Sequence, residues 1–255
     1  MLLNCDVGES FGHWKIGDDA KVIGNIDLAN IACGFHAGDP VIMDTAVRIA
    51  IKNKVIIGAH PGHCDLIGFG RRSINVSPKE LRASLSYQIG ALKEIAQVAG
   101  GTVSYVKPHG ALYNSMMQDD SLLSDIMEIV AYSLPPPARL IILYTEKAEI
   151  HKAMAESLRL KLWFEAFADR LYGDDGYLVD RSKKGSLFNS PEQIENQIKS
   201  IIDEGSVNSE NNKNLKIEAD TICIHSDNEP SIIEIEKIHK LFSKNRNHPC
   251  PIGDK

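Results

Sequence analysis

The strongest constraint on the fold is a regular alternation between short apolar segments, rich in β-branched residues, and longer amphipathic segments. Seven short segments have the length and composition of buried strands: 2–5, 26–32, 55–59, 102–106, 140–144, 162–166 and 221–224. Helical patterns lie between them, and this order is typical of an α/β protein with a mostly parallel sheet. Because the strands are apolar on both faces, they favour a closed or nearly closed barrel over the alternative, an open doubly wound sheet.

Residues 78–99 carry the clearest helical pattern, because leucine and isoleucine recur there at spacings of three and four residues. Ser77 lies at the expected N-cap and Glu80 follows three residues later, which is typical of a capping box. Gly100 and Gly101 come directly after the pattern and indicate where the helix ends. The sequence therefore predicts a long helix between the third and fourth strands.

The chain shows no shift in composition that would divide it into separate domains. We expect one βα-barrel domain over residues 1–245 and a disordered tail over 246–255, which contains two prolines and no periodicity. Two internal segments are predicted to be loops. The first, 172–191, is rich in Gly, Asp and Ser, and the second, 205–214, is polar enough that we expect it to be mobile.

The bulk composition argues against several classes of protein. A net charge of −6 gives no basic footprint of the kind that binds nucleic acid. The start of the chain lacks the basic region of a signal peptide, and no uncharged apolar run approaches the roughly 18 residues of a membrane span. The five cysteines form no CxxC pair, which argues against a disulfide framework. We therefore expect a cytoplasmic protein that binds neither nucleic acid nor membranes.

Charged and imidazole side chains follow almost every predicted strand. The residues found there include Asp6, Glu9, His36, Asp39, His60, Arg71, Arg72, Lys107, His109, Glu165, Asp169, Arg170, His225 and Asp227. In a parallel barrel the carboxyl ends of all strands meet at one rim, where barrel enzymes build their active sites. We therefore expect Asp6, His60 and His109 to line one cavity, with Lys107 close enough to influence their protonation.

Some of these residues also have plain structural explanations. A lone histidine after a strand is more often structural than catalytic, although four at equivalent positions are harder to explain in that way. Asp39 directly precedes a proline and is expected to be the N-cap of a helix. Cys5 and Cys33 are expected to be small buried hydrophobic residues. Asp169 and Arg170 are neighbours, and an ion pair within their loop is the structural alternative to a catalytic role.

Five segments carry a family resemblance: 3–12 (LNCDVGESFG), 30–40 (NIACGFHAGDP), 58–72 (GAHPGHCDLIGFGRR), 106–114 (VKPHGALYN) and 165–172 (EAFADRLY). In order and spacing, from residue 2 to about residue 241, the chain closely resembles the LamB/YcsF family. The resemblance implies a distorted seven-stranded, TIM-like βα barrel similar to that of the polysaccharide deacetylases. It also implies a part in the ATP-dependent hydrolysis of 5-oxo-L-proline (pyroglutamate) to L-glutamate, together with two partner subunits, B and C.

The rim residues supply the groups that the opening of an unstrained cyclic amide needs. We assign proton transfer and charge stabilisation to a catalytic set, Asp6, His60, Lys107, His109, Glu165 and Asp169. We assign substrate binding to Glu9, His36, Arg71, Arg72, Arg170, His225 and Asp227, with the adjacent Arg71 and Arg72 available for the substrate carboxylate. Because the chain has no GxxxxGK[ST] motif, we expect ATP to be handled with the partner subunits.

Two other functions fit the same residues. One is a metal-dependent, deacetylase-like hydrolase, in which Asp6 with His36, His60 and His109 binds a divalent ion that activates water. The other is a non-catalytic subunit that binds an acidic metabolite. Metal content after purification distinguishes the first function, and ligand binding without turnover distinguishes the second.

Overall fold

The computed structural model describes residues 1–227, 229–233 and 235–244, and its centre is a closed barrel of parallel strands. The strands, in their order around the barrel, are β1 (Leu2–Val7), β2 (Leu28–Ala32), β3 (Ile56–His60), β4 (Val103–Val106), β5 (Arg139–Leu143), β6 (Lys161–Phe167) and β9 (Thr221–His225). Each overlaps one of the seven predicted segments. The prediction of a closed barrel is confirmed, because β9 pairs with both β1 and β6.

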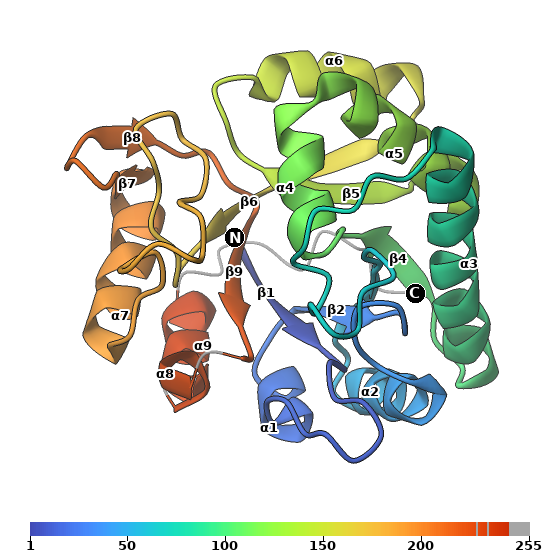
Figure 1. Ribbon diagram of the computed structural model, residues 1–255. Coiled ribbons are helices and arrows are strands. Elements are labelled where there is room, and N and C mark those ends of the chain that lie inside the picture. The colour runs from blue at the N-terminus through green and yellow to red at the C-terminus, as the bar shows by residue number, and fades with distance from the viewer. Residues whose placement is uncertain (228, 234, 245–255) are drawn as a thin grey trace.

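Helices cover the outside of the barrel (Figure 1). They are α1 (Asp19–Ile23), α2 (Pro40–Lys52), α3 (Pro78–Val98), α4 (Gly110–Gln118), α5 (Asp120–Ser133), α6 (Ala148–Ser157), α7 (Pro191–Lys199) with the π-helical turn η1 (Ser200–Glu204), α8 (Glu229–Ile233) and α9 (Ile235–Lys244). The predicted capping box of Ser77 and Glu80 begins α3, and Asp39 caps α2 through the amides of Val41 and Ile42. Both structural predictions are therefore confirmed.

The barrel interior has an apolar floor and a polar layer above it. Leu28, Tyr105, Ile141 and Trp163 pack together inside the barrel. Side chains two positions further along a strand point to the same face, so the row that contains Tyr105 continues with Lys107. In the same way, Trp163 is followed by Glu165. Leu28 is likewise followed by Asn30, whereas Ile141 is followed by the apolar Leu143. Three of the four rows therefore continue with a polar residue nearer the carboxyl ends of the strands.

The polar segment 205–214 is not a mobile loop, so this prediction was wrong. Its two ends lie in a hairpin of β7 (Ser206–Asn208) and β8 (Asn214–Lys216), which pair antiparallel. Val207 and Leu215 face each other across the pair and are buried in the main core. Two apolar side chains in a polar stretch were enough to fix the hairpin. The predicted tail, 246–255, lies outside the described residues.

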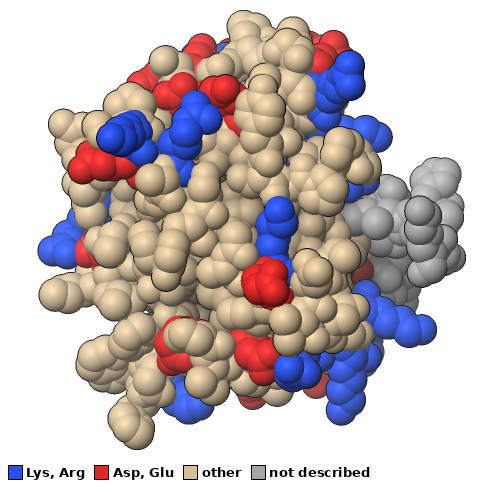
Figure 2. Space-filling model, turned by 90° about the vertical axis from the view of Figure 1, so that its right-hand side faces the viewer, with Lys and Arg blue, Asp and Glu red and all other residues tan. Residues whose placement is uncertain are grey.

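The surface carries mixed charges. Figure 2 shows one face of the molecule, on which acidic and basic side chains lie near one another around a broad area without charge. Within the described chain, no helix combines the length and the apolar composition needed to cross a membrane.

Candidate active site

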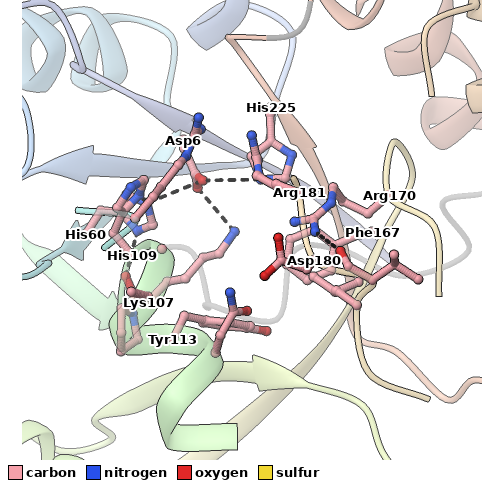
Figure 3. Close-up of a pocket in the computed structure, with 17 residues that line it drawn as sticks. Asp6, His60, Lys107, His109, Tyr113, Phe167, Arg170, Asp180, Arg181 and His225 are labelled. Carbon is pink, nitrogen blue, oxygen red and sulfur yellow. Dashed lines mark hydrogen bonds and ion pairs between the residues drawn. The ribbon is translucent and has the colours of Figure 1, made fainter. Parts of the chain in front are cut away.

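A polar cavity of about 130 Å³ lies at the carboxyl ends of the barrel strands. The residues predicted from the sequence that line it are Asp6, His60, Arg71, Lys107, His109, Arg170 and His225. They come from strand ends and from the loops that follow, and they point into a common space (Figure 3). The expected convergence of Asp6, His60 and His109 in one cavity is therefore confirmed.

The chain that leaves β4 stays beside β3 and so brings a lysine and a histidine to the pocket. The Lys107 amide donates to the Ala59 carbonyl at 2.9 Å, and the His109 amide donates to the Pro61 carbonyl at 2.8 Å. These bonds continue the pairing of β3 and β4 past the end of β4. The stretch between the strand and α4 is therefore held by the backbone rather than free to move as a loop.

The Lys107 ammonium group lies in a buried cluster of acceptors. Its Nζ is 3.2 Å from Asp6 Oδ1, 3.2 Å from Asn4 Oδ1, 3.1 Å from Glu165 Oε2 and 3.0 Å from Cys223 Sγ. An ammonium group has three N–H donors, so these four groups occupy all of them. Lys107 is thus engaged with the protein, and its main effect on the site is electrostatic.

Asp6 and Lys107 keep each other ionised. Burial alone would raise the pKa of Asp6, but the neighbouring His60 and Lys107 outweigh it and hold that pKa well below its usual range. Burial would also lower the pKa of Lys107, but Asp6 and Cys223 outweigh it and raise that pKa well above its usual range. We call the wall formed by Asp6, His60, Lys107 and His109 the histidine side of the pocket.

Backbone carbonyls fix the proton positions on two of the histidines. His60 Nδ1 lies 2.6 Å from the Lys107 carbonyl, and His109 Nε2 lies 2.8 Å from the Phe69 carbonyl. A carbonyl only accepts, so both of these ring nitrogens carry hydrogen. In neutral rings the lone pairs then sit on His60 Nε2 and His109 Nδ1, which are 2.9 Å apart. Two lone pairs repel at this distance, so the arrangement calls for a proton or a cation beside them.

Glu9 and His36 lie buried next to this pair. The His36 ring stacks on His109 with centroids 3.8 Å apart, and Glu9 Oε1 lies 3.5 Å from His36 Nε2 and 3.6 Å from His109 Nδ1. Neither Glu9 Oε1 nor either ring nitrogen of His36 has a hydrogen-bond partner. Burial lowers the pKa of His36 and His109 well below the usual value, which favours the neutral form that binds metals.

Two glycines leave the space that these rings occupy. A Cβ atom on Gly62 would lie 2.9 Å from His36 Nδ1. A Cβ on Gly70 would lie 2.7 Å from His36 Cβ and 2.9 Å from His109 Cδ2, and Gly70 also has a φ of +63°. Any larger residue at these positions would push the stacked rings apart.

A metal ion fits this group of residues. One donor atom from each of Glu9, His36, His60 and His109 lies within 4.8 Å of the others, and three imidazoles with one carboxylate are suitable ligands for zinc and similar ions. The set expected from the sequence contained Asp6 in place of Glu9. In the structure Asp6 instead forms a second group with Cys223 and His225, because Lys107 and Asn30 hold the Asp6 carboxylate.

Asp169 and His225 form a hydrogen-bonded dyad. His225 Nδ1 donates to the Asp169 carboxylate at 2.9 Å, and the backbone amide of His225 donates to the same carboxylate at 3.2 Å. Burial raises the pKa of Asp169, but the His225 imidazole outweighs this and brings it to about 2. The ring stacks on Phe167 with centroids 5.6 Å apart, and its Nε2 lies 3.9 Å from Asp6 Oδ2. Asp169 therefore orients an imidazole that lines the pocket.

Arginines from two loops also line the pocket: Arg71 follows β3, and Arg170 and Arg181 belong to the loop between β6 and α7. Arg71 and Arg181 both pair with the Asp227 carboxylate, the latter at 3.4 Å. Arg170 donates through Nη2 to the Val179 carbonyl at 2.7 Å, while its buried Nε has no hydrogen-bond partner. Burial and the nearby Arg181 guanidinium lower the pKa of Arg170 to about 10. We call the wall formed by Arg71, Arg170 and Arg181 the arginine side of the pocket; Figure 3 labels the last two of these residues.

Six of the predicted site residues do not line this cavity. Glu9, His36, Glu165 and Asp169 are buried around it, and Asp227 bridges two arginines at its edge. Arg72 is the clearest correction: its side chain is 62% exposed and pairs with Asp65 rather than facing the pocket with Arg71. Arg71 lines the pocket and pairs with Asp227, whereas the Asp65 carboxylate engages Arg72.

The structure adds pocket residues that the sequence did not single out. Tyr113 and Asn114 lie in the same segment as His109, one turn into α4, where a helical spacing could have indicated them. Asp180 and Arg181 belong to the loop between β6 and α7. That loop was predicted only as Gly-, Asp- and Ser-rich, and nothing in its composition points to the pocket.

A closed parallel barrel with acids, imidazoles and a buried lysine at its carboxyl rim places the chain among TIM-like barrel proteins with an enzyme-like site. The chain belongs to the LamB/YcsF family, whose model matches residues 1–254. A relative from Vibrio vulnificus, named as the A subunit of 5-oxoprolinase, is 47% identical over 245 residues, covering 96% of this chain and 98% of the relative. A relative from Pseudomonas putida, named as a second form of the 5-oxoprolinase A subunit, is 45% identical over 243 residues, covering 95% and 93%.

A solved structure agrees with these matches. The crystal structure of a lactam utilization protein from Thermus thermophilus superimposes with a TM-score of 0.82 at 34% identity. The match covers 96% of this chain and 97% of that one, so the barrel and its inserted elements are shared nearly in full.

Proposed function

We propose that this chain is the A subunit of an ATP-dependent 5-oxoprolinase and hydrolyses 5-oxo-L-proline to L-glutamate together with subunits B and C. The names of the two relatives and of the Thermus protein support this activity and a multi-subunit complex. The observation that carries the proposal is the oriented imidazole of His225 beside the ionised Asp6, in a pocket that also presents arginines. We also propose that the complex works in the cytoplasm, where the buried free cysteines would stay reduced.

The reaction needs activation of a stable amide. Water adds to the lactam carbonyl carbon, the ring C–N bond breaks, and the nitrogen takes a proton to leave as the amino group of glutamate. Transfer of the ATP γ-phosphoryl group to the carbonyl oxygen makes that carbon more electrophilic. Attack by water and cleavage of the C–N bond then leave an acyl phosphate, and a second water molecule hydrolyses it to the glutamate carboxylate and free phosphate. Because the sequence has no recognisable phosphate-binding loop, we assign the phosphoryl transfer to the partner subunits.

The structure supports separate roles for the residues on the two sides of His225. Its Nδ1 hydrogen bond to Asp169 fixes the tautomer, so Nε2 can take a proton from the attacking water. Asp6 Oδ2 lies 3.9 Å from that nitrogen, so a carboxylate stands beside the group that takes the proton. Lys107 holds the charge of Asp6 in place, and Glu165 pairs with Lys107 in turn, so we assign neither of them a contact with the substrate.

A divalent metal ion would fit next to these residues. Glu9, His36, His60 and His109 would hold it, as the unpartnered donor atoms and the facing lone pairs indicate. When bound, such an ion would act as a Lewis acid towards a carbonyl or a water molecule. The chain's own part is to keep His36 and His109 neutral by burial and to exclude bulk water from the ligands.

The same group of ligands favours a second candidate function, a metal-dependent hydrolase that needs no ATP. This function requires that the purified chain contain a stoichiometric metal and hydrolyse an amide by itself. Metal analysis, followed by assays of acetylated amines with and without a chelator, distinguishes it. Activity of the lone chain that disappears with chelator and returns with zinc would replace our proposal.

Reconstitution tests the main proposal. Glutamate and ADP would be measured with the chain alone, with the partner subunits alone and with all three, each with 5-oxo-L-proline and ATP. We expect product only from the complete mixture, with one ADP for each glutamate. Full activity from the lone chain would contradict the division of labour, and full activity without the chain would show that it takes no part in the chemistry. A His225→Gln chain in the same mixture separates a catalytic subunit from one that only binds the substrate.

A further inference from the structure

The histidine side of the pocket is unsuited to an anionic group. Its lysine, Lys107, already lies between the carboxylates of Asp6 and Glu165 at 3.2 and 3.1 Å. A further carboxylate at this point would find no free N–H of the lysine and would be repelled by two buried negative charges. A ligand with one negative charge therefore has to place it elsewhere in the pocket.

The arginine side has a hydrogen-bond donor that no group among the described residues uses. Arg170 lines the cavity and is almost fully buried, yet its Nε donor has no partner. The guanidinium groups of Arg71, Arg170 and Arg181 are accompanied by two carboxylates, those of Asp180 and Asp227. Asp169 also acts on Arg170 and Arg181, but its carboxylate is engaged by the His225 imidazole, so the guanidinium groups that line the cavity remain suited to binding a carboxylate.

The space between the two sides is partly apolar. Phe167, Leu178 and Val179 line it, and the first of these also stacks on His225. Methylene groups of a small saturated ring suit such a surface. The pocket thus combines imidazoles and a carboxylate, an apolar surface and guanidinium groups; Figure 3 shows His60 and His109 on one side of the view, and Arg170 and Arg181 with Phe167 on the other.

We propose that Arg170 and Arg181 form the carboxylate-binding subsite of this pocket, which makes it specific for lactams that carry a carboxylate on the ring carbon at the other side of the nitrogen from the amide carbonyl. The inference rests on the proposed function and deepens it, since it fixes how the substrate lies. With the carboxylate on the arginine side, the amide carbonyl points towards His225 and Asp6. Arg181 reaches the pocket from the loop between β6 and α7, so that loop sets the specificity.

Steady-state kinetics of the reconstituted complex test this subsite. The substrate is 5-oxo-L-proline, and 2-pyrrolidinone, the same ring without the carboxylate, serves as a competing neutral lactam. The variants are Arg181→Gln, which removes the charge from a partly exposed position, and Arg170→Lys, which keeps the charge but loses the Nε donor. Arg48→Gln on α2 is the matched control, because Arg48 is exposed and pairs with Asp44 in its own helix, away from the pocket.

We expect Arg181→Gln to raise the KM for 5-oxo-L-proline by about 10- to 100-fold, the range for loss of a charge-assisted hydrogen bond, with a smaller effect on kcat. Inhibition by 2-pyrrolidinone should be unchanged in this variant. Arg170→Lys should also raise KM, and Arg48→Gln should behave as the wild type. Thermal unfolding of each variant checks that the fold is intact.

Three results would overturn the subsite. The first is an unchanged KM in Arg181→Gln. The second is that Arg181→Gln weakens the binding of 5-oxo-L-proline and of 2-pyrrolidinone equally. Both results would leave the proposed function, lactam hydrolysis, standing. The third is competition by inorganic phosphate that disappears in Arg181→Gln, which would assign the arginines to a phosphoryl group. A wild-type complex that acts on neither lactam would instead refute the proposed function, and the subsite with it.

Discussion

The histidine side and the arginine side of the pocket are built in different ways. The histidine side is made from strand ends, and its polar atoms are buried and held by one another or by backbone carbonyls. The arginine side is made from loops, and Arg71 and Arg181 share one carboxylate while Arg170 keeps a donor without a partner. Apart from the facing nitrogens of His60 and His109, the polar atoms of the histidine side have partners among the described residues, whereas the arginine side keeps a donor without one.

This difference suggests a division of tasks. Groups that must hold a defined protonation state benefit from a rigid, dry setting, in which neighbouring charges act strongly. Groups that recognise a substrate can stay partly exposed, because binding itself completes their hydrogen bonds. Changes on the histidine side should therefore affect turnover most, whereas changes on the arginine side should affect affinity.

Replacing His109 should have the largest effect. For His109→Ala we expect glutamate formation by the complete complex to fall by about 10²–10⁴-fold, as large as the loss of a proton-transfer group, because His109 contacts His60 beside Asp6 and offers a nitrogen to the group of residues that suits a metal. KM should change much less, and binding to subunits B and C should be retained in pull-down experiments. His109→Asn leaves a smaller cavity than His109→Ala, so a similar loss of activity in both variants would show that the cavity is not the cause. Wild-type turnover in either variant would remove the histidine side from the mechanism.

Lowering the pH should show how much the buried pair of Asp169 and His225 contributes to the free energy of unfolding. The pKa of Asp169 is about 2 in the folded protein, below its usual value of 3.8. The folded state therefore gains stability above the unfolded pKa and loses it as the pH falls from about 4 towards 2. The loss is about 2 kcal/mol for this one group. Denaturant unfolding at several pH values measures it.

Asp169→Asn is the matched control for that titration. Since asparagine does not ionise, the variant should lose less stability than the wild type between pH 4 and pH 2. Parallel curves for the two proteins would show that the ionised Asp169 contributes nothing to folding.

The same variant should lower activity near neutral pH. An asparagine at this position would leave the His225 ring without the carboxylate that fixes its tautomer. We therefore expect a fall of at least roughly tenfold, or about 1.4 kcal/mol in transition-state stabilisation. Steady-state assays of the complex measure kcat, and thermal unfolding is followed alongside. A loss of activity that only follows unfolding would indicate a structural role for Asp169.

The smallest effect is expected at Arg72. Because this side chain is largely exposed and pairs with Asp65 outside the pocket, Arg72→Gln should leave kcat and KM of the complex within about twofold of the wild type, as is usual for an exposed ion pair. Its neighbour Arg71 faces the pocket, so Arg71→Gln should raise KM. An equal rise in both variants would mean that the loop presents the two arginines together when substrate binds.

The sequence was a good guide to the histidine side for a physical reason. Strand ends of a parallel barrel must meet at one rim, so a polar residue at the end of each apolar run is placed once the barrel is inferred. Asp6, His60, Lys107 and His109 were found in this way. The exchange of Asp6 for Glu9 in the group that suits a metal could not be foreseen, because it depends on which carboxylate the lysine engages.

The residues of the arginine side could not all be assigned to the pocket from the sequence. Arg181 lies in a loop whose path is set by contacts beyond its immediate neighbours, such as the hydrogen bond from Arg170 to the Val179 carbonyl. Arg71 and Arg72 are identical in type and adjacent in sequence, yet only one lines the pocket. Loop residues have no periodicity that would assign them to a face, so their direction is decided by the packing around them.

By itself the sequence determined the alternation of strands and helices, the caps of α2 and α3, and the set of polar residues that gather at one rim. These follow from local periodicity and from side-chain chemistry, which act over a few residues. Only the tertiary structure decided that 205–214 forms a hairpin, that Asp169 orients His225, and that Arg181 enters the pocket. Each of these depends on contacts between residues that local patterns do not connect, and their geometry arises only when the barrel closes.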